Sequence, residues 1–90
     1  MRIIYTLGKK TVEVAVDGPC ALKVYEVPAA YSDDKLFAAV WMPGDLEPIP
    51  ACRHADAVLL AHVELVKGDG DAMKLVQMRL ARGEVRYAAN

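Results

Sequence analysis

The chain has 90 residues, 54% of them hydrophobic. This predicts a single compact domain over residues 1–90 and excludes a disordered chain, which would lack apolar surface to bury. A formal net charge of −1 excludes a strong overall field that would select a polyanion or a basic partner. The apolar runs are much shorter than the roughly 20 residues of a membrane-spanning helix. The first residues also lack the features of a secretory leader, so we expect a cytoplasmic protein without membrane contact.

The cysteines and the charged residues are unevenly placed. Cys20 and Cys52 are the only cysteines and lie far apart, which favours two free thiols in a reducing compartment over one disulfide. Charged residues between positions 33 and 56 are mostly acidic, whereas those between positions 74 and 86 are mostly basic. This asymmetry suits a contact with a partner, although an ordinary solvated surface is the simpler explanation.

Three strands are predicted at the start of the chain. Residues 2–7 (RIIYTL) and 11–16 (TVEVAV) are rich in β-branched residues, and a Gly-Lys-Lys turn signal separates them. Residues 2–16 should therefore form a β-hairpin. Residues 20–27 (CALKVYEV) predict a third strand, which Pro28 ends.

Residues 32–42 predict a helix. Ser32 suits the N-cap because its hydroxyl can accept a hydrogen bond from a free backbone N–H, and two aspartates follow in the first turn. One helical face would gather Leu36, Phe37, Val40 and Trp41. Pro43-Gly44 should end this helix, and the proline-rich residues 43–50 should form a stiff, exposed loop.

Residues 51–67 predict a second helix. At 100° per residue most apolar side chains fall on one arc, together with His62, which should be buried or half-buried. Leu60 is the exception, because it lies on the polar side and would face water or a partner. Gly68 is well placed to end the helix. A strand over residues 57–66 is the alternative, because valine is abundant there.

The last part of the chain predicts strands again. Residues 73–81 alternate apolar and polar side chains, and residues 84–88 follow a Gly-containing turn; the alternative is a helix that continues to Arg82. The predicted fold class is α+β, with an antiparallel sheet of about four to five strands packed against one or two helices. A mainly β fold is the alternative. The predicted core comprises Ile3, Tyr5, Val12, Val14, Val24, Phe37, Val40, Val58, Leu59, Val63, Val66, Val76, Met78 and Leu80.

The sequence offers no convincing catalytic or metal site. On a helix, His54 and His62 would be separated by about 12 Å of rise, too far apart to bind one ion. The Gly-Asp-Gly-Asp stretch at residues 68–71 lacks the later oxygen ligands of a calcium loop. We therefore predict no metal, cofactor or catalytic residue. The alternative is a small-molecule site or minor enzyme that uses His62 with Cys20 or Cys52 once the chain has folded.

A second alternative is nucleic-acid binding through Arg79, Arg82 and Arg86. These residues would make few phosphate contacts, so binding would be weak and strongly dependent on salt. Nucleic acid is therefore not an expected partner.

The favoured function is that of a small non-enzymatic protein-interaction module. It would act as an adaptor or inhibitor of a larger protein, and a homodimer is one form that it could take. Large aromatic residues and methionine are enriched at interface centres. The candidate partner-binding residues are Trp41, Met42, Asp45, Glu47 and Leu60.

Overall fold

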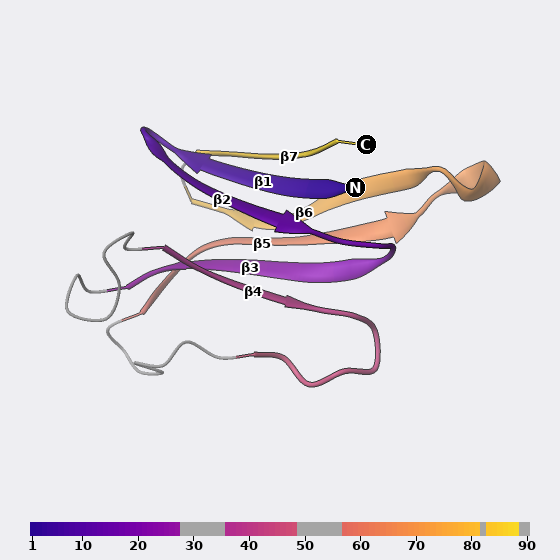
Figure 1. The fold of residues 1–90 in the computed structure, drawn as a ribbon, viewed down its shortest axis with the longest axis horizontal. Coiled ribbons are helices and arrows are strands. Elements are labelled where there is room, and N and C mark those ends of the chain that lie inside the picture. The colour runs from indigo at the N-terminus through magenta and orange to yellow at the C-terminus, as the bar shows by residue number, and fades with distance from the viewer. Residues whose placement is uncertain (28–35, 49–56, 82, 89–90) are drawn as a thin grey trace.

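The structure is a computed structural model, and it describes residues 1–27, 36–48, 57–81 and 83–88. These residues form seven strands and a short 3-10 turn at Asp69–Asp71 (Figure 1). The strands are β1 (Arg2–Leu7), β2 (Lys10–Ala15), β3 (Cys20–Glu26), β4 (Leu36–Trp41), β5 (Val58–Lys67), β6 (Met73–Leu80) and β7 (Glu84–Ala88).

The strands make two antiparallel sheets. The three-stranded sheet has the order β2-β1-β7, and the four-stranded sheet has the order β4-β3-β5-β6. One hydrophobic core cluster draws side chains from both sheets, so the sheets form a small sandwich around it. Figure 1 shows the three-stranded sheet along one side of the molecule and the β3–β4 pair along the other.

Alternation along the strands explains the three-stranded sheet. Ile3 and Tyr5 on β1 are almost fully buried and lie opposite Val14 and Val12 of β2. Tyr5 also pairs with the buried Val85 of β7. Charged side chains lie on the opposite face, where Arg2 and Glu13 form an ion pair at 2.5 Å. One face therefore packs on the core while the other faces water.

The four-stranded sheet contributes the other half of the core. Cys20, Leu22 and Val24 alternate along β3 and are all buried. Their partners on β5 are Leu65, Val63 and Ala61 in the same order, and these are also buried. Burying each Leu or Val side chain stabilises the fold by roughly 1.5–3 kcal/mol.

The predicted α+β fold class is wrong, and the mainly β alternative is correct. In place of the two predicted helices, the described residues form β4 and β5. The helical interpretation of residues 32–42 rested on Ser32 as an N-cap, on the two aspartates that follow it and on an apolar helical face. In the structure both faces of β4 carry apolar side chains: Leu36 packs in the core, and Ala39, which points the opposite way, has no exposed surface. A strand with apolar side chains on both faces lacks the polar alternation that identifies strands in a sequence.

The strand alternative for residues 57–66 agrees with β5. Abundant valine, which suits a pleated strand, outweighed the helical periodicity. Ser32, His54 and Cys52, together with residues 28–35 and 49–56, lie outside the described residues, as does Arg82.

The predicted core is correct in part. Ile3, Tyr5, Val24 and Val63 are buried, and Val12, Val14 and Val40 pack against the core. Three predicted core residues are exposed instead, namely Val58, Met78 and Leu80. Before the register shift at Met78, the residues of β6 opposite the buried Leu65 and Val63 are Leu75 and Gln77, so the predicted apolar series that includes Met78 does not follow the core side of the strand.

Candidate interaction site

The outer face of the four-stranded sheet points away from the core. Neighbouring strands place side chains of different chemistry side by side on it. Ala21 on β3 lies between Trp41 of β4 and Glu64 of β5. Two residues further along β3, Lys23 lies between Ala39 of β4 and His62 of β5. We call the surface around Trp41, Lys23 and Glu64 the outer face.

The chain after β4 returns over the outer face through a tight turn. The Asp45 backbone N–H donates to the Met42 carbonyl at 3.0 Å, which closes a β-turn with Pro43 and Gly44 at its centre. Gly44 has φ +91°, a conformation that side chains disfavour, so the Pro-Gly pair suits this turn. The turn brings Glu47 back onto the sheet.

Lys23 connects the returning loop to the aromatic residue. Its ammonium lies 2.7 Å from the Glu47 carboxylate and 5.7 Å from the centre of the Trp41 ring. The hydrogen bond to Glu47 raises the pKa of Lys23, although burial acts in the opposite direction. A cation at this distance from an aromatic ring is attracted by the electrons of the ring face. The Trp41 ring is therefore contacted by the Lys23 ammonium, whose charge is balanced by the Glu47 carboxylate.

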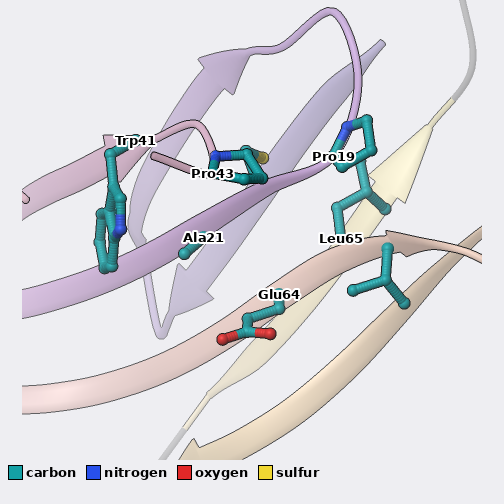
Figure 2. Close-up of a pocket in the computed structure, with 8 residues that line it drawn as sticks. Pro19, Ala21, Trp41, Pro43, Glu64 and Leu65 are labelled. Atoms are coloured by element: carbon teal, nitrogen blue, oxygen red, sulfur yellow. The ribbon is translucent and has the colours of Figure 1, made fainter. Parts of the chain in front are cut away.

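Beside Trp41 the surface is hollowed. The hollow has a volume of about 230 Å³, and its lining includes Pro19, Trp41, Pro43 and Glu64. Figure 2 shows Trp41 at the left, Pro43 between Trp41 and Pro19, and the Glu64 carboxylate below Ala21. Proline rings have few internal degrees of freedom, so the part of the wall that Pro19 and Pro43 form is rigid before anything binds.

Glu64 is the charged group in the wall of the hollow. Its side chain is 43% exposed, and its carboxylate lies 3.9 Å from Nε2 of His62. That contact is an ion pair only when the histidine is protonated. The carboxylate is therefore accessible to a cation or a hydrogen-bond donor that enters the hollow.

The structure brings together some of the residues predicted from the sequence. Trp41 and Glu47 meet through Lys23, and Asp45 is exposed in the adjoining turn. Met42 is half-buried and packs against the core.

Leu60 lies elsewhere in the molecule. Val24 pairs with Ala61 and Tyr25 with Leu59, so Leu60 is the extra residue in a bulge of β5. It is only 7% exposed, because the bulge turns it into the core. The exposed position expected on a helix does not exist.

Sequence reasoning missed Pro19, Lys23 and Glu64. Pro19, before β3, carried a turn signal but no functional one. Lys23 looked like an ordinary strand position, and Glu64 looked like a solvated residue on the polar side of the predicted helix. Only the register of β3, β4 and β5 places them around Trp41.

The arrangement gives no support to catalysis by Cys20 and His62. Cys20 points into the core, where burial raises the pKa of its thiol, and it is a free cysteine. His62 lies on the outer face, on the opposite side of the sheet. Among the described residues, no group of three or more histidine, cysteine or acidic side chains could hold a metal ion.

The basic residues do not form one surface either. Arg79 pairs with His62 and so belongs to the outer face of the four-stranded sheet. Arg86 pairs with Ile4 on the three-stranded sheet and lies 3.8 Å from Glu84. Arg79 and Arg86, the two candidate arginines that the structure describes, therefore point to opposite sides of the sandwich, which weakens the nucleic-acid alternative.

Comparisons with known proteins give no relative. No family model matches the chain, and searches of curated proteins and of solved structures find no match. Within the described ranges, no helix is long and apolar enough to cross a membrane.

Proposed function

We propose that this protein is a non-enzymatic interaction module that binds a larger protein as an adaptor or inhibitor. The observation that carries the proposal is the preformed hollow lined by Trp41, Pro19 and Pro43 on the outer face. Tryptophan is among the residues that contribute most to binding at protein interfaces. The free, buried Cys20 thiol supports placing the module in the cytoplasm.

The site is also organised before binding. The Lys23–Glu47 ion pair and the contact of Lys23 with the Trp41 ring restrict the aromatic side chain. Because the Trp41 side chain is already restricted, binding costs less of its conformational entropy than it would with a mobile tryptophan. The hydrogen bond between Asp45 and Met42 closes the turn that holds Pro43 in the wall of the hollow.

Replacing Trp41 with alanine should strongly weaken the interaction. The tagged protein would be immobilised, a lysate of its source cells passed over it, and the retained protein quantified. Trp41→Ala should reduce the apparent affinity at least tenfold, because a buried interface tryptophan typically contributes about 2 kcal/mol or more. Met78→Ala is the matched control: Met78 is 58% exposed on β6 and lies away from the hollow, so its loss should leave retention unchanged.

The outcomes separate cleanly when both variants give the native circular dichroism spectrum. Equal retention by wild type and Trp41→Ala, or loss in Met78→Ala alone, would contradict the proposal. Retention of an untagged copy by the tagged protein in the same experiment tests the homodimer. The observation that favours a homodimer is the exposed apolar stretch of β6 around Met78 and Leu80.

A further inference from the structure

We infer that the hollow beside Trp41 binds a lysine or arginine side chain presented by the partner protein. This inference rests on the proposed function and adds to it the chemistry of the group recognised. Three features of the described residues support it: the size of the hollow, its apolar wall, and the balance of charge around it.

The size of the hollow fits one side chain. Sites for small-molecule ligands usually measure about 300–1,000 Å³. The volume here is about 230 Å³, which is below that range. The hollow therefore suits a single long side chain inserted from a neighbouring surface better than a separate metabolite.

The wall suits the stem of a basic side chain. Pro19, Trp41 and Pro43 offer apolar surface, and Figure 2 shows the Glu64 carboxylate at the edge of the same hollow. Lysine and arginine combine a flexible apolar stem with a charged end, and they bury the stem while the charge remains near polar groups. A wholly apolar side chain would use the wall but would make no favourable contact with the carboxylate.

The surrounding charge favours a cation. Of the described residues that line the hollow, Glu64 is the one that carries a charge, and it is negative. Lys23 is neutralised by Glu47 at 2.7 Å, so its repulsion of a second cation is reduced. The Trp41 ring already has one ammonium 5.7 Å from its centre, a distance at which aromatic rings attract cations. An acidic side chain in the hollow would instead meet Glu64 without compensation.

The test uses the fluorescence of Trp41, which is the only tryptophan in the chain. The intact protein would be titrated with capped hexa-arginine and hexa-lysine peptides, and with capped hexa-glutamate and spermidine for comparison. The basic peptides should change the Trp41 emission saturably, and hexa-glutamate should not. Glu64→Gln should weaken basic-peptide binding by about tenfold, the usual effect of losing a charge-assisted hydrogen bond.

Glu84→Gln is the matched control, because it removes the same charge from an exposed position on β7. It should bind the peptides like the wild type. Equal weakening in both variants would show that the peptides respond to overall charge only, and would overturn the inference. Binding of spermidine as tight as that of the peptides would indicate a small polyamine as the occupant, and a lack of response to basic peptides would exclude a basic side chain.

Failure of the inference is distinguishable from failure of the proposed function. If Trp41→Ala abolishes partner capture while basic peptides do not bind, the proposed interaction function is supported. In that case the inference that the hollow binds a basic side chain is wrong. If basic peptides bind at Glu64 while Trp41→Ala leaves partner capture unchanged, the hollow binds cations but does not mediate the interaction.

Discussion

Gly83→Ala should lower the free energy of unfolding by about 3–5 kcal/mol, because it combines a disfavoured backbone conformation with a steric clash. Gly83 has φ +92°, which an alanine adopts only with strain. A Cβ atom there would also lie 2.2 Å from the Thr6 carbonyl oxygen and 3.1 Å from the Tyr5 hydroxyl. The carbonyl belongs to β1 at the point where it pairs with β7, so it cannot move without disturbing that pairing.

Gly44→Ala isolates the contribution of the clash. Gly44 has nearly the same backbone angle, φ +91°, but a Cβ atom there would meet nothing within 4 Å. Its cost should be about 1–2 kcal/mol, the strain of the left-handed conformation alone. Urea unfolding of the two variants measures the difference. Equal losses would contradict the close approach of Gly83 to β1.

Leu22→Ala should cost about 2–5 kcal/mol, the usual range for a leucine removed from a packed core. Leu22 is 1% exposed and lies at the centre of the four-stranded sheet, between Val40 of β4 and Val63 of β5. The truncation would leave a cavity facing the other sheet. The loss would be a large part of the total stability of a domain of this size, which is about 5–13 kcal/mol.

Leu46→Ala is the control for Leu22→Ala, because it makes the same substitution at an exposed leucine. Leu46 is 94% exposed in the loop after β4, so its truncation should change the free energy of unfolding by no more than about 0.5 kcal/mol. Denaturant unfolding monitored by Trp41 fluorescence would report both variants. A small effect at Leu22, or similar effects at the two leucines, would show that the core does not lie between the two sheets as described.

Much of the fold could be predicted for strands that have one face exposed to solvent, because such strands alternate apolar and polar residues. The hairpin of β1 and β2, the third strand and the last two strands all follow from alternation or β-branched composition with turn signals between them. The prediction failed at β4 because residues 36–41 are apolar on both faces, and a sequence cannot distinguish such a strand from a short buried helix. It failed at β5 because valine and leucine happen to recur at helical spacing.

The site could be predicted only in outline. Trp41 and Glu47 stood out because a tryptophan and a carboxylate close to a proline-rich loop suggest an interface. Their proximity to Lys23 and Glu64 depends on which residues of β3, β4 and β5 lie opposite one another, and composition does not determine that register. Leu60 misled the prediction for the same reason: a single bulge residue reverses the direction of its side chain.

The most direct test of the outer face as the binding surface is nuclear magnetic resonance of the isotope-labelled protein as the captured partner is added. The account predicts that the largest changes occur at the Trp41 indole N–H and at the backbone amides of Ala21 and Glu64, which line the hollow. Changes concentrated at Met78 and Tyr87, on β6 and β7, with the Trp41 signal unmoved, would contradict it.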